Sequence, residues 1–280
     1  MGDYMFTSPM LLFKAKNNQP FNSNLHLTEL KLDGIRLIID YRDDKVKIYT
    51  RHNNDVTAKF PELIENIPIH RGTTLDGELI VTDSDGKPNF ESVMERFMSK
   101  KSKHKVTFCA FDIINFEGKS VTSRPLVERK ELLAAAFEDN EYYTKSKYIL
   151  GNGIEYFNLV KQQKLEGVVL KDINSIYEID KRSDKWLKVI AYEVGEYYIA
   201  GYKKNEFGWL LSDGQRIVGV MTLAVGVNER KAGYRVFQQL KKSETEDTVY
   251  IDPVIKCVVK HRGYTKNNML RLPEFESFVF

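Results

Sequence analysis

The stretch TELKLDGIRLIIDY, residues 28–41, decides how the first part of this chain is interpreted. It places Lys31 just before an Asp-Gly pair and an arginine, and it continues into a run of β-branched and apolar residues. That run predicts a buried strand. An Asp-Gly pair suits residues with a positive φ and favours a hairpin turn. An ordinary hairpin is therefore one interpretation, and a lysine presented at a strand end is the other.

The composition predicts a folded intracellular protein. The chain has 280 residues, of which 42% are hydrophobic, enough for the core of one large domain or of two. There is no run of about 20 apolar residues, and the first residues lack the pattern of a secretory signal, so we expect a cytoplasmic location and no membrane partner. Cys109 and Cys257 lie in separate apolar runs and are expected to be reduced core residues rather than zinc ligands.

The charges are nearly balanced but unevenly spread. Lys and Arg number 42, Asp and Glu number 39, and local positive excess with nearby aromatic residues occurs at 101–105, after Lys203 and from Lys256 onward. Such segments suit a polyanion, because each phosphate neutralised by a cation releases counterions. A solvated basic face explains any one of them equally well.

The spacing of apolar residues predicts an α+β fold. Up to about residue 190 it indicates strands at 36–41, 45–50, 75–81, 106–114 and 166–172, and helices at 58–67, 90–98, 126–137 and 154–164. From residue 191 to 280 short strands separated by turn residues dominate, with one helix at 229–242. Five or so strands and one helix fit a small barrel of the oligonucleotide-binding type. We therefore predict two domains, 1–190 and 191–280.

Two glutamates stand out because they occur within strand-like runs. Glu78 shares a strand face with Asp76 by period-two alternation, and Glu166 opens a strand that ends with Lys171. An unpaired carboxylate in a core is very costly, so each glutamate needs a cation. A salt bridge at a strand end would satisfy that need, and it is the alternative to a functional site.

Six motifs in order, ELKLDGIR, YTRHN, LDGELIV, FCAFDII, LEGVVLKD and SDKWLKV, resemble the motif series of ATP-dependent DNA ligases within the covalent nucleotidyltransferases. The resemblance covers nearly the whole chain and is strongest to the minimal ligases of bacteria and their phages. It implies a nucleotidyltransferase (adenylation) domain with mainly antiparallel sheets and flanking helices, followed by an all-β OB-fold barrel. We expect the protein to act in the cytoplasm of a bacterial or phage-infected cell, and, since nothing in the sequence indicates an oligomer, as a monomer.

The resemblance implies a reaction in which Lys31 attacks the α-phosphate of ATP, releases pyrophosphate and carries AMP. The AMP is then passed to the 5′-phosphate of a nick in duplex DNA, and the neighbouring 3′-hydroxyl displaces it. A lysine is nucleophilic only when neutral, so its pKa must be lowered by nearby cations or desolvation. Mg²⁺ or Mn²⁺ is implied as a cofactor, because carboxylate oxygens suit these ions.

The resemblance also assigns residues to the nucleotide. The Glu29 segment is expected to contact adenine, Phe111 to stack on the adenine ring, and Glu78 to hold the ribose or the metal. The expected ATP contacts are Glu29, Arg36, Arg51, Glu78, Phe111, Lys171 and Lys188. Core packing is the rival explanation for Phe111, and a closed turn with two asparagines is the rival for Arg51.

The metal and the DNA have their own expected residues. Glu166 matches the principal metal-binding carboxylate, with Glu78 beside it. Arg36 and Arg51 match arginines that grip phosphates of the nucleotide and the nick. Strand-like alternation adds three DNA contacts in the second domain, Lys256, Lys260 and Arg262.

The chain departs from the family pattern at two places. Ile190 stands where a second lysine of the last lysine motif is often found, so one phosphate contact is expected to be missing or supplied elsewhere. The end of the chain, RLPEFESFVF, lacks an Arg-x-Asp-Lys motif that orients pyrophosphate. Either the motif is dispensable here, or Arg271 or another basic residue replaces it, or the first step is slow.

Two other functions are weighed against a DNA ligase. An RNA ligase or an RNA-capping guanylyltransferase would share the fold and the lysine chemistry, although the wording of the later motifs is closer to DNA ligases. A non-catalytic oligonucleotide-binding protein would have no use for Lys31, Glu78 and Glu166 together. The sequence leaves the pathway open, whether DNA repair, replication or end joining.

Overall fold

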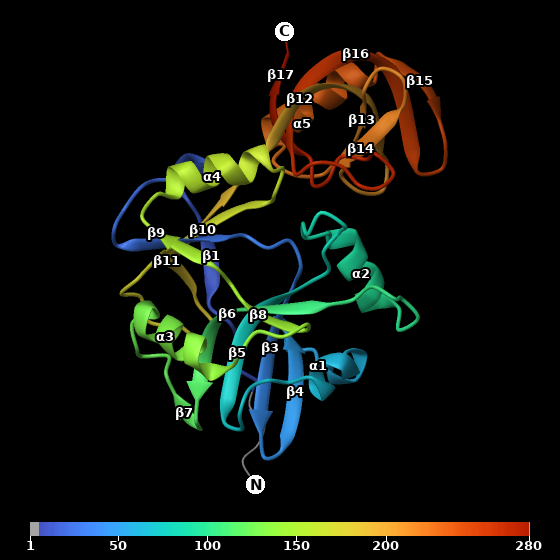
Figure 1. The fold of residues 1–280 in the computed structure, drawn as a ribbon. Helices are drawn as coiled ribbons and strands as arrows, with labels where there is room; N and C mark the ends of the chain where they lie inside the picture. Colours follow the sequence, from blue (N-terminus) through green and yellow to red (C-terminus); the bar gives the residue numbers. More distant parts are fainter. Residues whose placement is uncertain (1–5, 280) are drawn as a thin grey trace. The chain divides into compact units, whose positions relative to one another are not determined.

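The computed structural model describes residues 6–279, which divide into two compact units between Ala191 and Tyr192 (Figure 1). Each unit has an apolar core of its own, so each is described by itself. Within the described residues, none of the helices has the length and apolar character needed to cross a membrane.

The first sheet holds the main core of the first unit. Its strands run in the order β4, β3, β5, β6, β7, with β8 also paired to β6, and all pairings except β6 with β8 are antiparallel. Leu37 and Ile39 lie in the main core, whereas Arg36 and Ile38 alternate with them and face the other side. The bounds are β3 Ile35–Arg42, β4 Lys45–Thr50, β5 Thr73–Ile80, β6 Thr107–Phe116, β7 Lys119–Ser120 and β8 Tyr143–Lys145.

The second sheet of this unit brings together strands from both ends of the sequence. Its order is β1, β11, β10, β2, β9, with β1 parallel to β11 and the other pairs antiparallel. One face packs on helix α4, where Val160 meets Val168, Leu170 and Val189. The bounds are β1 Leu11–Lys14, β2 His26–Leu30, β9 Tyr148–Leu150, β10 Gly167–Asp172, β11 Arg182–Ile190 and α4 Gly153–Gln162.

The stretch 28–41 is a crossing between the two sheets and not a hairpin. Strand β2 belongs to the second sheet and β3 to the first, so Lys31 lies where the chain leaves one sheet for the other. Gly34 is needed there because a Cβ atom would lie 2.2 Å from the carbonyl oxygen of Leu79. Close approach to β5, and not a left-handed turn, therefore explains the glycine.

Short helices cover the edges of the first unit. Helix α2 begins after Asn89, whose side chain accepts a hydrogen bond from the Ser92 backbone N–H and caps the helix. Helix α3 packs on β6 and buries Arg129 and Lys130 along with its apolar residues. The bounds are η1 Lys16–Asn18, η2 Thr57–Lys59, α1 Pro61–Glu65, α2 Phe90–Met98 and α3 Leu126–Ala136.

The second unit is a sheet of short strands with one helix. Strands follow the order β14, β13, β12, β16, β15, and β17 also pairs with β16; an isolated bridge between Leu223 and Glu274 spans the other side. The short strands and the helix are those expected of the predicted OB-fold domain. Among the described residues this sheet does not close completely, because an isolated bridge stands where a continuous strand pairing would be needed. The bounds are β12 Glu193–Lys203, β13 Trp209–Ser212, β14 Ile217–Met221, α5 Val227–Phe237, β15 Lys241–Glu244, β16 Thr248–His261 and β17 Glu274–Phe278.

The predicted α+β class with mainly antiparallel sheets is confirmed. Every strand and helix predicted from apolar spacing is present, although the helix predicted at 58–67 is a 3-10 turn followed by the short α1. Strands β1, β2, β7, β8, β9, β15 and β17 were not predicted, because segments of five residues or fewer carry too little periodicity. The nine-residue β11 was not predicted either, and the helix predicted at 229–242 ends at Phe237, because Lys241 and Lys242 belong to β15. Cys109 and Cys257 are buried free thiols, and burial raises the pKa of each to about 12.

Candidate active site

The second sheet presents its polar residues on one face. Residues directly opposite each other in neighbouring strands share a face, and Val169 of β10 lies opposite both Glu29 of β2 and Lys188 of β11. Two residues along the strand, Lys171 is on the same face. Lys31 continues the pattern two residues beyond Glu29, and its backbone N–H donates to the Gly167 carbonyl. Four predicted site residues therefore gather on the face opposite to helix α4.

The first sheet contributes residues from its non-core face. Arg36 of β3 lies opposite Glu78 of β5, which lies opposite Cys109 of β6. The pairing of β5 with β6 then slips, so that Gly77 lies opposite Ala110 but Asp76 lies opposite Asp112. Phe111 is the extra residue of this β-bulge, and a bulge re-aims the side chain at its position. The bulge explains why Phe111 does not join the main core.

Lys31 forms an ion pair with Glu166. The Lys31 Nζ lies 2.8 Å from the Glu166 Oε2, and the side chains are 21% and 5% exposed. Glu78 lies close enough for Lys31 and Arg36 to lower its pKa, but burial dominates and raises that pKa to about 8, with Glu166 adding to the rise. A partly exposed amine beside two carboxylates is an arrangement that can bind a metal ion or a phosphate group.

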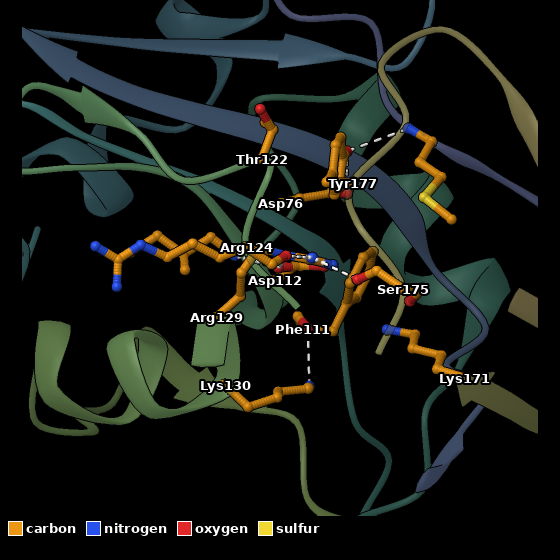
Figure 2. A network of polar contacts seen from close by, with 12 residues as sticks. Asp76, Phe111, Asp112, Thr122, Arg124, Arg129, Lys130, Lys171, Ser175 and Tyr177 are labelled. Carbon is orange, nitrogen blue, oxygen red and sulfur yellow. Dashed lines mark hydrogen bonds and ion pairs between the residues drawn. The ribbon is translucent and has the colours of Figure 1, made fainter. Parts of the chain in front are cut away.

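Arg36 is held by Asp76. The guanidinium donates two hydrogen bonds to the Asp76 carboxylate, at 2.9 and 2.6 Å. Burial alone would lower the pKa of Arg36, but the ion pair with Asp76 raises it, so the group stays charged. Tyr177 donates from its hydroxyl to Asp76 at 2.7 Å and accepts from the Met10 backbone N–H at 3.2 Å (Figure 2).

A second buried cluster surrounds Glu29. One carboxylate oxygen contacts Lys130 of α3, and the other lies 2.7 Å from the Lys171 Nζ. The Lys171 Nζ also lies 4.5 Å from the centre of the Phe111 ring and 4.1 Å from that of the Trp186 ring. Burial lowers the pKa of Lys171 to about 8, against the opposing effect of Glu29. Positive charge is thus concentrated against the two rings.

A fully buried ion pair supports these residues from behind. Arg129 of α3 donates two hydrogen bonds to Asp112 at 2.8 Å each and two more to the carbonyls of Arg124 and Ser175 (Figure 2). Both side chains of the ion pair are 0% exposed. The Ser175 hydroxyl in turn lies 3.2 Å from the Trp186 indole nitrogen, which donates to it. This network ties α3, β6 and the segment before β11 together.

Other predicted residues lie in different surroundings. Arg51 is exposed in the turn after β4, where its Nε donates to the neighbouring His52. In the second unit, Lys256 and Lys260 lie on the outer face of β16, 3.7 Å from Glu196 and 2.5 Å from Glu276. The roles predicted for these residues and for Arg262 stay predictions.

Glu78 and Glu166 are the carboxylates that could bind the implied metal ion. Among the described residues, no three His, Cys, Asp or Glu side chains gather closely enough to hold a metal by themselves. Mg²⁺ commonly takes one or two protein carboxylates and completes its shell with water and phosphate oxygens. Glu78 and Glu166 fit such a partial shell, because they lie close enough for Glu166 to help raise the pKa of Glu78.

Some site residues escaped the sequence analysis. Lys130, Asp112 and Arg129 were not predicted, and Asp76 and Tyr177 were given no role. A signal for two of them was present: Arg129 and Lys130 fall on the apolar stripe of the helix with Leu126 and Leu133. Cations on a buried stripe need buried partners, which the sequence alone does not identify.

Several known proteins are similar to this chain in sequence. The family described as "ATP dependent DNA ligase domain" matches residues 9–189. The SPbeta prophage-derived DNA ligase-like protein LigB of Bacillus subtilis (strain 168) is 49% identical over 278 residues, 98% of this chain and 99% of that protein. The multifunctional non-homologous end joining protein LigD of Mycolicibacterium smegmatis is 28% identical over 249 residues, 85% of this chain but 32% of that protein.

Solved structures agree on the fold. A mycobacterial DNA ligase D complexed with ATP and MES has a TM-score of 0.61 and 23% identity, covering 98% of this chain and 95% of that one. A Lig E DNA ligase has a TM-score of 0.69 and 21% identity, covering 98% of this chain and all of that one, 100%.

The site combines a lysine amine beside carboxylates with a guanidinium that Asp76 holds, between two sheets of this fold. This combination is that of an enzyme that transfers nucleotidyl groups. The family match and the similarity to LigB over nearly the whole chain narrow the class from nucleotidyl-transferring enzymes to DNA ligases that use ATP. The chain belongs to the ATP-dependent DNA ligase family, and it is an enzyme of that family that uses ATP. The predicted resemblance is confirmed, and the RNA-directed alternative is not favoured.

Proposed function

We propose that this chain seals nicks with 5′-phosphate and 3′-hydroxyl ends in duplex DNA, carrying AMP on Lys31 and then on the DNA. The observation that carries the proposal is the Lys31 amine, partly exposed and 2.8 Å from Glu166. Lysines without a chemical role usually extend into water, whereas this one is held at the junction of two sheets beside Glu78 and Arg36.

The first step forms one bond and breaks one. The neutral Lys31 Nζ bonds to the α-phosphorus of ATP, and the bond from that phosphorus to the bridging oxygen breaks, so that pyrophosphate leaves with the electron pair. The amine must lose a proton first, and among the described carboxylates Glu166 is hydrogen-bonded to it. Because phosphoryl transfer depends mainly on positioning and charge neutralisation, Arg36, Lys171 and Lys188 would supply the cations.

The implied metal ion would be held by Glu78 and Glu166. When bound, Mg²⁺ or Mn²⁺ would neutralise charge on the α-phosphate oxygens. The two glutamates would keep the ion beside the lysine, and the negative charge that binds the ion would require Glu78 to lose its proton.

The DNA contacts are proposed from charge. Arg36, fixed by Asp76, keeps a guanidinium face for a phosphate. Arg51 is exposed and free to reach a backbone phosphate. Lys256 and Lys260 share one face of β16, and Arg262 follows the last residue of that strand; the three would bind the duplex from the second unit. We further propose that the protein acts as a cytoplasmic monomer.

The test is strand joining on matched 5′-phosphorylated nicked duplexes, one all-DNA and one all-RNA, with ATP and Mg²⁺. Wild type is compared with Lys31→Ala and with Lys59→Ala, a lysine that donates to the Phe97 carbonyl away from these residues. Sealing of the DNA nick that is lost only in Lys31→Ala supports the proposal. Sealing of RNA alone, or covalent labelling by GTP instead of ATP, would overturn it in favour of an RNA-directed enzyme.

A further inference from the structure

Lys130 is a buried lysine that the reaction described above does not use. It lies on α3 with its side chain 2% exposed, and its Nζ donates to the Glu29 carboxylate. The same Nζ donates at 2.8 Å to the Phe111 carbonyl (Figure 2). The same Nζ lies 5.3 Å from the centre of the Tyr148 ring. Burying an ammonium group is costly unless it is paired, so this arrangement requires a specific acceptor.

Glu29 is that acceptor, and two cations surround it. Lys130 contacts one oxygen and Lys171 the other, and the Glu29 side chain is 3% exposed. An ammonium group donates toward each oxygen of this carboxylate, so both oxygens act as acceptors in this arrangement. Each oxygen still has a lone pair for one more donor.

The place of Glu29 relative to Lys31 indicates which donor that would be. The two residues share a strand face and are two positions apart, about 7 Å along the strand. A nucleotide with its α-phosphate at Lys31 has its base one ribose away, so the base would lie at the level of Glu29. Phe111, whose ring contacts Lys171, supplies aromatic surface at the same level, and the buried Trp186 lies on Lys171 as well.

We infer that Lys130 is a positioning residue that fixes Glu29 as a hydrogen-bond acceptor for the 6-amino group of adenine, so that 6-oxo purines are rejected. Adenine presents an amino donor at position 6, and guanine presents an oxygen acceptor there. With guanine bound, the Glu29 carboxylate would face the guanine oxygen. Both are acceptors, so neither would gain a hydrogen bond in place of the water it loses. This inference rests on the proposed function and names what selects its nucleotide.

The experiment measures covalent labelling of the protein with ATP and with inosine triphosphate, whose base has an oxygen at position 6. Initial rates at varied nucleotide concentration give the ratio of kcat/KM for the two nucleotides. Because both rates come from one preparation, any inactive fraction of a variant cancels in the ratio. The variants are Lys130→Met, Lys130→Arg and the control Lys145→Met.

Lys145 is a matched control in the same unit. Like Lys130, it contacts a carboxylate, a backbone carbonyl and an aromatic ring, here Asp139 at 2.9 Å, the Phe137 carbonyl and the Phe137 ring. It lies at β8, its contacts are with Asp139 and Phe137, and its side chain is 21% exposed, compared with 2% for Lys130. A general effect of removing a paired lysine should therefore appear in both variants.

For Lys130→Met we expect the ATP preference to fall about ten-fold or more, mainly through a higher KM for ATP. Lys130→Arg, which keeps the charge and the donors, should retain the preference within about three-fold, and Lys145→Met should match wild type. Equal slowing with both nucleotides in Lys130→Met would overturn the inference while leaving the proposed function intact. Failure of wild type to label with any nucleotide would overturn the proposed function, and this inference with it.

Discussion

Lys31 Nζ and Glu166 Oε2 lie 2.8 Å apart although 135 residues separate them in the sequence. The contact exists because β2 and β10 are neighbours in the second sheet, with Glu29 opposite Val169. It joins the proposed nucleophile to the proposed metal-binding carboxylate before any ligand enters.

Replacing Glu166 by glutamine should nearly abolish self-adenylation. The amide keeps the size of the side chain but removes the charge that pairs with Lys31 and would bind the metal ion. We expect covalent labelling by ATP to slow about a hundred-fold or more, as when a charged group at a phosphoryl-transfer site is lost. Glu141→Gln, which removes an exposed partner of Lys105, is the control and should label like wild type. A rate for Glu166→Gln within a few-fold of wild type would contradict the assigned role.

Glu78 should make stability depend on pH. Burial raises its pKa from an ordinary 4.5 to about 8, so between these values the folded protein holds a proton that the unfolded chain releases. Stability therefore falls as the pH rises from about 4.5 through about 8. Thermal unfolding without metal should show that Glu78→Gln is little changed at pH 5 and is more stable than wild type at pH 9. If Glu78→Gln and wild type differed in stability by the same amount at pH 5 and at pH 9, titration of Glu78 would be excluded as the cause.

Breaking the Asp112–Arg129 pair should destabilise the first unit. Arg129→Met leaves Asp112 charged and buried, with a cost of about 3–5 kcal/mol in the free energy of unfolding. Denaturant unfolding measures it. The exposed pair of Arg124 with Glu128 provides the comparison, because Arg124→Met should cost about 0.5 kcal/mol or less. Replacing Asp112 by leucine in the Arg129→Met background should recover part of the loss, since no unpaired charge then remains.

Phe111 should contribute to nucleotide binding through its ring. Removing the ring in Phe111→Ala should raise the KM for ATP about ten-fold, because stacking of a base on an aromatic ring contributes about 1–3 kcal/mol. Phe111→Tyr keeps the ring and should stay close to wild type. The exposed Phe13 of β1 is the control position. An unchanged KM in Phe111→Ala would leave packing beside Trp186 as the role of the residue.

Two lysines of β16 and the arginine just after it should affect how DNA binding depends on salt. If Lys256, Lys260 and Arg262 contact phosphates, replacing all three by glutamine should lower the slope of log affinity against log salt by about 2–3. Lys256 and Lys260 would exchange Glu196 and Glu276 for phosphate on binding. Lys241→Gln with Lys242→Gln, on β15, is the control pair. A slope equal to that of wild type in the triple variant would exclude these contacts.

Much of the fold follows from local pattern. The strand at 36–41 and the helix at 90–98 are present as expected, since alternation and the helical repeat reflect which faces are buried. The order of the six motifs indicated the family, because residue types and their spacing can be compared without knowing which strands pair. The short strands of the expected OB-fold domain are present, but how far its sheet closes was not predictable, since closure depends on the pairing of strands distant in sequence.

The candidate site depended more on tertiary structure. The sequence by itself determined that Lys31, Glu78 and Glu166 are polar residues at strands, and it identified the chemistry that such a set performs. Only the tertiary structure decided that Asp-Gly crosses between two sheets, that a bulge turns Phe111 out of the core, and that Lys130 reaches Glu29 from a helix 101 residues away. The physical reason is that strand register and the pairing of buried charges are settled by contacts across the fold, which no local pattern of residues encodes.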